Sequence, residues 1–286
     1  VAMRPRAAAR PLAAAARPAA SLRPRPPSAA AAVASPGLLG CMLGPSEKLV
    51  IWIRHGHSLH NAEQEAAAAE GRDTSAAIDH GRFFDSPLSE GGRGQAEALG
   101  RQLGAAGVEL VAVSPLRRAL QTALLAFPGA PLHVREDLRE RHFGLPVDCR
   151  GSRSQVAAEL ASAAGADLGG LQGEEDPFPA RARERSAEAE ERSRRALEWL
   201  LARPERRVAV VSHGWLLQLG LLSPRAGLLR LEGAGPEPHL GRPLRNCEAR
   251  AFAVRSVAGL GAAAKPVAVA RPVALRELGG AAAARL

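Results

Sequence analysis

The chain has 286 residues, which is enough for one large α/β domain or two small ones. Hydrophobic residues make up 46% of it, but aromatic residues only 3%, so the core must depend on Leu, Val and Ala. The formal net charge is +9, and residues 1–46 supply +6 of it through six arginines and no acidic residue, which leaves +3 for the remaining 240 residues. This near balance, without basic residues interleaved with aromatic ones, argues against a nucleic-acid-binding protein.

Three cysteines, Cys41, Cys149 and Cys247, are widely spaced and form no C-x-x-C pair. A disulfide framework or a structural zinc site is therefore not expected, and a reducing compartment fits better. No apolar run reaches the ~18–20 residues of a membrane span. The longest candidate, Val208–Leu222, is interrupted by three polar residues and is better explained as a buried strand followed by a helix.

Residues 1–46 are low-complexity sequence built from Ala, Arg, Pro and Ser, with eight prolines. Such a segment buries too little apolar surface to offset its ordering entropy, so we expect a disordered tail. An Arg-rich, acid-free N-terminus that contains Ser is typical of a transit peptide to a plastid or mitochondrion. The alternative is compositional drift, because the whole chain favours Ala, Arg, Gly and Pro; the protein would then be cytoplasmic.

Apolar runs and 3–4 spacing predict alternating strands and helices after this tail. The predicted strands are Lys48–Ile53, Val108–Val113, Leu132–Val134, Val208–Val211 and, at an edge, Asn246–Val254. The predicted helices are Ala62–Glu70, Ser89–Ala106 with Ser89 as N-cap, Leu116–Phe127, Ala180–Ala202 and Trp215–Leu222. This alternation predicts a three-layer α/β fold, with a mostly parallel central sheet and helices on both faces.

Four segments are predicted to be irregular. We expect Arg54–Asn61 to form a loop, and Gly71–Ser86 to pass over the site to which this loop belongs. Residues 145–180, rich in Gly, acidic residues and Pro around one Ala-rich helix, are predicted to form a lid or side lobe. Residues 257–286 form a low-complexity C-terminal tail with no identifiable chemistry.

Two of the predicted strands run directly into a histidine followed by glycine. Lys48–Ile53 leads into Arg54-His55-Gly56, and Val208–Val211 into Ser212-His213-Gly214. A lone strand-end histidine is usually structural, but two such ends in one chain are unlikely to arise by chance. In an open α/β sheet the C-terminal strand ends form the ligand crevice. With the Arg54 fork and the small Gly56 beside it, we expect His55 to meet His213 there around a phosphoryl group.

Two further candidates follow other strand ends. Arg118 lies in the first turn of the helix after Ser114-Pro115-Leu116, and helix N-termini already favour anions. Glu140 lies in Leu138-Arg139-Glu140-Arg141, where nearby basic groups would lower its pKa and burial would raise it. Alone, both residues could equally be solvated surface charges.

Two competing uses of these residue types fit poorly. His55, His57 and His60 have the spacing i, i+2, i+5, which gives no helical H-x-x-x-H face, and Arg54 beside them opposes a cation. A Ser-His-Asp hydrolase is not indicated, because the chain contains no G-x-S-x-G elbow. We therefore expect neither a metal nor a cofactor.

Five stretches, in order and spacing, resemble the histidine phosphatase superfamily, the phosphoglycerate-mutase-like fold, over about residues 48–256. Some details, including His60-Asn61, Asp148-Cys149-Arg150 and Asn246-Cys247-Glu248, are most similar to the plant and fungal phosphoglycerate-mutase-like proteins. The five stretches are Arg54–Asn61, Asp85–Ala96, Ser114–Ala123, Leu138–Arg141 and Val211–Gly214. The resemblance implies a histidine phosphatase domain over residues 47–256.

The resemblance also implies the roles of the candidate residues. His55 would attack phosphorus and form a phosphohistidine, with its other ring nitrogen donating to a backbone carbonyl. Glu140 would protonate the leaving oxygen and then activate water. His57 departs from the Glu or Gln often found at its position, and we expect it to be tolerated. The implied phosphate- and substrate-binding set is Arg54, Ser58, Asn61, Arg118, His213 and Gly214.

The function predicted on this basis is hydrolysis of a small phosphomonoester through a phosphohistidine. One alternative is a mutase, which must protect the phosphoenzyme from water, and the 145–180 lobe would decide between the two. The other alternative is a phospho-ligand-binding adaptor without turnover. The presence of every residue that the family needs argues against it. The sequence does not indicate the substrate or the oligomeric state.

Overall fold

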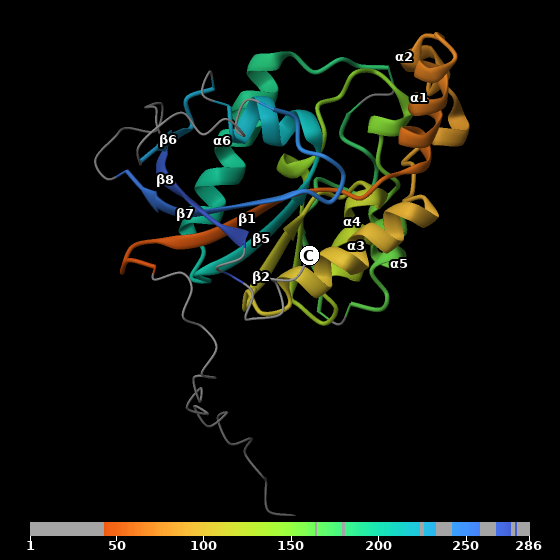
Figure 1. Cartoon of the computed structure of the whole chain (residues 1–286). Helices are drawn as coiled ribbons and strands as arrows, with labels where there is room; N and C mark the ends of the chain where they lie inside the picture. The colour runs from red at the N-terminus through yellow and green to blue at the C-terminus, as the bar shows by residue number, and fades with distance from the viewer. Residues whose placement is uncertain are drawn as a thin grey trace, which may run out of the picture. The chain divides into compact units, whose positions relative to one another are not determined.

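The computed structural model describes residues 43–163, 165–178, 181–223, 226–232, 242–257, 267–275 and 278 (Figure 1). The predicted N-terminal tail lies outside the described residues, apart from residues 43–46. The transit peptide within it therefore stays a prediction. Of the predicted C-terminal tail, residues 258–266 and most of those after 275 lie outside them too.

The described strands form one eight-stranded sheet in the order β4-β3-β2-β5-β1-β7-β8-β6. The pairings make β7 antiparallel to its neighbours and leave the other seven strands parallel, as predicted for a mostly parallel sheet. The strands are β1 (Lys48–Arg54), β2 (Leu110–Val113), β3 (Leu132–Arg135), β4 (Asp167–Gly170), β5 (Arg207–Ser212), β6 (Leu229–Leu231), β7 (Ala249–Ser256) and β8 (Ala268–Val273).

Two strands arise from segments that were predicted to be irregular. The predicted edge position of Asn246–Val254 is wrong, because β8 pairs with β7 and extends the sheet beyond residue 256. The sequence of β8 does not predict a strand, because it contains Pro272 and proline is rare inside a sheet. In the described part of the chain β6 pairs only with Ala268–Ala270, so Pro272 lies beyond this pairing and its missing N–H removes no hydrogen bond to β6. The 145–180 lobe contributes β4, which pairs with β3.

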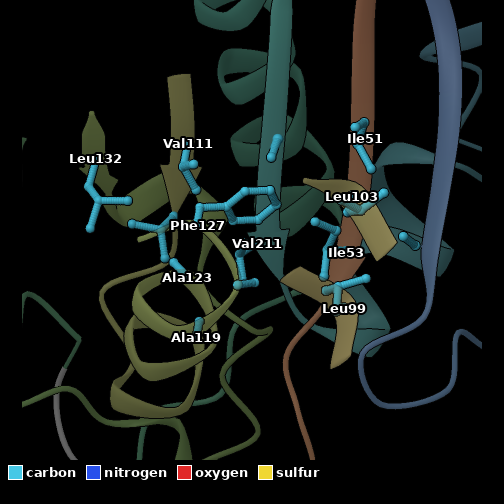
Figure 2. Packing of buried hydrophobic residues seen from close by; sticks show 14 of the residues in the cluster. Ile51, Ile53, Leu99, Leu103, Val111, Ala119, Ala123, Phe127, Leu132 and Val211 are labelled. Carbon is cyan, nitrogen blue, oxygen red and sulfur yellow. The ribbon is translucent and has the colours of Figure 1, made fainter. Parts of the chain in front are cut away.

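Helices cover both faces of the sheet. The apolar side chains of β1 alternate between the faces, so that Ile51 and Ile53 pack in one core cluster and Val50 and Trp52 in the other. Helices α3 (Glu90–Leu103) and α4 (Arg117–Ala126) line the first cluster (Figure 2). Helix α5 (Arg153–Glu159) adds Val156 to it. Helix α6 (Ser186–Ala202) and the π-helical segment η4 (Leu216–Leu221) line the second. Burial of each Val, Leu or Ile side chain stabilises the folded state by about 1.5–3 kcal/mol.

Helix α1 (Leu59–Ala69) begins three residues earlier than predicted, so the predicted Arg54–Asn61 loop is shorter. Ser58 is its N-cap, and the Asn61 side chain accepts a hydrogen bond from the Ser58 N–H (3.2 Å). This bond satisfies a backbone donor at the start of the helix. Short helical elements occupy other connections: α2 (Thr74–Ala77), η1 (Gly81–Phe83), η2 (Glu136–Leu138) and η3 (Pro146–Asp148). In the described part of the chain, no helix has both the length and the apolar character needed to cross a membrane.

The N-terminus of α3 packs directly on the loop that follows β1. Ser89 caps α3 by accepting the Gly92 N–H (3.1 Å), and its own N–H donates to the His57 carbonyl (2.9 Å). Any Cβ at Gly92 would overlap the His57 carbonyl oxygen, and one at Gly56 would lie 2.7 Å from the Gly92 carbonyl oxygen. Glycine at both positions therefore allows the helix to fix the path of residues 55–58.

This close approach predicts opposite effects for two glycines of α3. Gly92→Ala forces a methyl group onto the backbone of His57, and we expect it to lower the free energy of unfolding by about 2 kcal/mol or more. Gly94 is exposed, with no atom within 4 Å of its Cβ position. Gly94→Ala should therefore raise the free energy of unfolding by about 0.5–1 kcal/mol. Urea unfolding monitored by circular dichroism measures both, and equal effects would contradict the predicted contact.

Candidate active site

The structure brings His55 and His213 together at the C-terminal ends of adjacent parallel strands. In the register of β1 and β5, Arg54 lies opposite Ser212, so the two histidines follow paired residues. The His55 N–H donates to the Ser212 carbonyl (2.9 Å), and the two ring centroids are 5.0 Å apart. Both side chains are buried. The site therefore lies at the strand ends where α/β sheets bind ligands.

The hydrogen bonds of His55 define which ring nitrogen carries the proton. Its Nδ1 lies 2.7 Å from the Gly56 carbonyl oxygen, which can only accept, so Nδ1 is the donor. This is the backbone contact that the family resemblance implied. Burial, followed by the charges of Arg118 and Arg54, holds the pKa of His55 well below its ordinary value. The ring is therefore neutral, and Nε2 carries a lone pair available to an electrophile.

Two arginines from separate elements face this imidazole. Arg118, in the first turn of α4, directs Nε at His55 Nε2 (3.3 Å) and donates from Nη1 to the Val147 carbonyl (2.8 Å). Arg54, at the end of β1, donates from Nη1 to the Leu244 carbonyl (2.8 Å). In the part of the chain that the structure describes, neither guanidinium lies within ion-pair distance of a carboxylate.

Two buried nitrogens at this point, Arg54 Nε and His213 Nδ1, have no hydrogen-bond partner among the described residues. His213 Nε2 lies 2.7 Å from the Ser114 hydroxyl, for which no other acceptor is described. We assign this hydroxyl, which already accepts the Leu116 N–H, as the donor to Nε2, and this assignment places the proton of the neutral ring on Nδ1. Burial and the Arg118 charge hold the pKa of His213 well below its ordinary value, which keeps that ring neutral. Unmatched buried donors beside uncompensated cations form an anion-binding site.

Glu140 presents its carboxylate from the segment after β3. The carboxylate accepts the backbone N–H groups of Arg141 (3.0 Å), Trp215 (3.2 Å) and Leu216 (3.2 Å). These donors tie Glu140 to the chain that follows His213. They also orient the carboxylate, since two of them come from the start of the helical segment after β5.

The pKa of Glu140 is raised, first by burial and then by the negative charge of Asp148, while Arg118 and the backbone donors oppose the rise. Arg192 of α6 binds the backbone of the segment that carries Glu140. Arg192 makes a bidentate ion pair with Glu184 (2.8 and 2.7 Å) and donates to the carbonyl of Arg139 (2.8 Å). Glu140 is thus a half-buried carboxyl group that holds a proton more readily than a free one, on a rigid support.

Asn61, Ser58 and Gly214, which the resemblance implied to bind substrate, lie in the segments that carry His55 and His213, and their contacts with substrate stay a prediction. Asn61 Oδ1 accepts from the Ser58 hydroxyl (2.8 Å) and from Asn246 Nδ2 (3.3 Å), so that side chain chiefly organises the loop. Ser58 is fully buried and caps α1. A Cβ at Gly214 would lie 3.4 Å from Arg54 Nε, so glycine leaves room beside this unmatched donor.

Three positioning contacts were missed in the sequence. Thr122, one turn after Arg118 in α4, accepts the Gly56 N–H (2.9 Å) and donates to the Arg118 carbonyl (2.7 Å). Its spacing of four from Arg118 is a signal that could have been used. Asn246 donates to the His55 carbonyl (3.1 Å), and Cys247, with a φ of 56°, donates from its N–H to the Arg54 carbonyl (3.0 Å). No local signal links residues 191 positions apart.

The three histidines of the first motif do not share a metal site. The His57 side chain contacts Ser89 and Glu65, with Nδ1 2.8 Å from the Ser89 hydroxyl and Nε2 3.3 Å from the Glu65 carboxylate. His60 is buried, its ring 6.2 Å from that of His55, and burial with the charges of Arg118 and Arg54 lowers its pKa to about 2. Among the described residues, no group of three or more His, Cys, Asp or Glu side chains is placed to hold a metal ion.

The Thr122 bridge predicts different outcomes for two substitutions. Thr122→Val keeps the shape but leaves the buried Gly56 N–H without an acceptor, and should cost about 1–3 kcal/mol of unfolding free energy. Thr122→Ser keeps the hydroxyl and should cost less than about 1 kcal/mol. Urea unfolding of the two variants checks this. A loss in Thr122→Ser larger than that in Thr122→Val would show that the methyl group matters more than the bridge at this position.

This chain is similar to known proteins in sequence and in fold. The model of the histidine phosphatase superfamily (branch 1) matches residues 50–226. Phosphoglycerate mutase-like protein 1 of Arabidopsis thaliana is 28% identical over 206 residues, 59% of this chain and 69% of that protein. The solved mycobacterial glucosyl-3-phosphoglycerate phosphatase has 24% identity and a TM-score of 0.45, and covers 72% of this chain and 93% of its own. The ecdysone phosphate phosphatase of Bombix mori has 18% identity and a TM-score of 0.47, with 72% and 88% covered. The family-model match extends over more than half of the sequence, so this chain belongs to the histidine phosphatase superfamily.

Proposed function

We propose that this protein is a phosphatase that hydrolyses a small phosphomonoester through a phosphohistidine on His55. The observation that carries the proposal is the environment of His55 Nε2. This nitrogen is an unprotonated nucleophile, held 3.3 Å from Arg118 Nε and beside the unmatched donors of Arg54 and His213. A nucleophile surrounded by free anion-binding groups suits attack on an electrophile that is itself anionic.

The first step is an in-line displacement at phosphorus. His55 Nε2 attacks, the ester P–O bond breaks, and Glu140 gives its proton to the leaving oxygen as an alcohol departs. The non-bridging phosphoryl oxygens accept hydrogen bonds from Arg54, Arg118 and His213 Nδ1. Arg118 Nε, which faces His55 Nε2 in the free site, transfers its hydrogen bond to one of these oxygens. Its fixed Nη1 contact with Val147 keeps the guanidinium in place for this exchange.

The second step returns the enzyme to its starting state. Glu140, now a carboxylate, takes a proton from water, whose oxygen attacks phosphorus as the P–N bond to His55 breaks. Inorganic phosphate leaves, and the lone pair returns to His55 Nε2. The raised pKa of Glu140 suits both steps, because the residue must hold a proton first and accept one later.

Replacement of His55 tests the proposal directly. We expect His55→Ala to lower the hydrolysis of phenyl phosphate roughly 10³-fold or more, because the nucleophile is lost. His57→Gln is the matched control, since His57 contacts Ser89 and lies outside the cluster, and it should keep wild-type activity. Acid-labile ³²P on denatured wild-type protein, absent from His55→Ala, would identify the phosphohistidine. Equal turnover by wild type and His55→Ala would refute the assignment, and a wild type without turnover or labelling would favour the adaptor alternative.

The charge of Asp148 predicts a shift in the pH profile. Phosphorylation needs protonated Glu140, so activity on an alkyl phosphate falls as the pH rises through the pKa of that group. Asp148 raises this pKa, so Asp148→Asn should lower it and move the descending limb of kcat/KM to lower pH. Glu97→Gln, which removes a charge from the exposed face of α3, should leave the limb in place. A limb unmoved in Asp148→Asn would argue against Glu140 as the acid.

A further inference from the structure

Asp85 joins separate segments of the chain at the start of α4. Its Oδ1 accepts the N–H of Arg117, the first residue of that helix (2.8 Å), and its Oδ2 accepts the N–H of Gly151 (3.0 Å). The Asp85 N–H in turn donates to the Pro146 carbonyl (3.3 Å). Asp85 therefore ties the first turn of α4 to residues 146–151, in the segment predicted to form the side lobe.

The backbone of Asp85 is strained to make these contacts. Its φ of 42° lies in the left-handed region, which few residues other than glycine adopt, although Asp and Asn do so more readily than most. Such a conformation costs about 1–3 kcal/mol and persists only where the surrounding contacts enforce it. Because Asp85 is also buried, its carboxylate depends on the two N–H groups for its hydrogen bonds.

These contacts bear on both ends of the Arg118 side chain. Arg118 directly follows Arg117, so the bond from Asp85 to the Arg117 N–H holds the backbone from which Arg118 projects. At the other end, Arg118 Nη1 donates to the Val147 carbonyl (2.8 Å), which lies in the segment that Asp85 also binds. With both ends linked through Asp85, Arg118 Nε is held 3.3 Å from His55 Nε2.

We propose that Asp85 is a positioning residue that acts through Arg118 and keeps its guanidinium in place for the transferred phosphoryl group. This inference rests on the proposed phosphatase activity, in which Arg118 binds a phosphoryl oxygen. A displacement of about 1 Å in a catalytic site can lower a rate about 100-fold, so a hydrogen bond outside the site can control turnover.

Two substitutions break the proposed link from its two sides. Asp85→Asn keeps the size of the side chain and suits the positive φ, but its NH2 group replaces one of the two acceptor oxygens. Arg117→Pro removes the N–H and leaves the Asp85 charge unchanged. Proline is favoured at the first position of a helix, and Leu116 before it is already extended (φ −70°, ψ 132°). Each substitution should lower kcat/KM for phenyl phosphate roughly tenfold or more.

Matched controls exclude effects of charge and of helix capping in general. Arg117→Met removes the side chain of that residue but keeps its N–H. Asp73→Asn makes the same chemical change as Asp85→Asn in a carboxylate that caps another helix, α2, where it accepts the N–H groups of Ser75 (2.8 Å) and Ala76 (3.1 Å). Both controls should keep the wild-type kcat/KM.

A double-mutant cycle shows whether Asp85 acts through Arg118. In an Arg118→Met background, Asp85→Asn should lower kcat/KM little further, because the group that it positions is already lost. A merely structural role lowers the fraction of active protein in both backgrounds alike. An equal fold loss with and without Arg118 would therefore overturn the inference.

Failure of this inference can be distinguished from failure of the proposed function. Circular dichroism identifies the folded variants, and either substitution alone is sufficient for the test. Wild-type kcat/KM in folded Asp85→Asn or folded Arg117→Pro would overturn the positioning role and leave the phosphatase proposal intact. If wild type does not hydrolyse phenyl phosphate or any other phosphomonoester, the proposed function fails, and the inference falls with it.

Discussion

The parallel pairing of β1 with β5 is the constraint on which the site depends. It places Arg54 opposite Ser212 and binds the His55 N–H to the Ser212 carbonyl, so two residues 158 positions apart acquire a fixed relation. The remaining groups are added to this pair from other elements. The first turn of α4 brings Arg118, and the segment after β3 brings Glu140. A slip of one residue in this pairing would invert the side chains of one strand and separate the two histidines.

Buried arginines serve two purposes in this molecule, and their partners distinguish them. Arg139, Arg150 and Arg192 are buried but matched by carboxylates, so they fasten the 136–176 region without a net local charge. Arg118 is buried and Arg54 is half-buried, and both are bound only to carbonyl oxygens and an imidazole. Burial of uncompensated charge is costly, and burial is accordingly the largest factor that lowers the pKa of each. The fold tolerates this cost where an anionic ligand would relieve it.

The sequence was sufficient to predict the centre of the site. Strong apolar runs end at His55 and at His213, and parallel strands share a C-terminal edge, so their convergence followed from pattern and topology. Arg118 was recognisable because the first turn of a helix after a strand end faces the same edge. The start of α1 was misplaced because Ser58 and Asn61 were interpreted as loop residues and not as a cap.

What the sequence did not reveal depends on long-range contacts. Asn246 and Cys247 bind the backbone of Arg54 and His55, but their hydrogen bonds become visible only when β7 is paired with β1. Similarly, β8 follows a low-complexity stretch and contains Pro272, so its propensity argues against a strand. Its pairing with β7 overrides that propensity, and among the described residues Pro272 lies beyond the part of β8 that pairs with β6.

The segment that carries Glu140 is held between two parts of the fold. Arg192 and Glu184 hold the backbone of this segment from the α6 side, while the N–H groups of Trp215 and Leu216 hold the Glu140 carboxylate from the β5 side. Held on both sides, the Glu140 carboxylate keeps a fixed position relative to the backbone that directly follows His213. The proposed acid and one of the proposed phosphate-binding residues are therefore positioned by the same stretch of chain, so a change that moves one of them is expected to move the other.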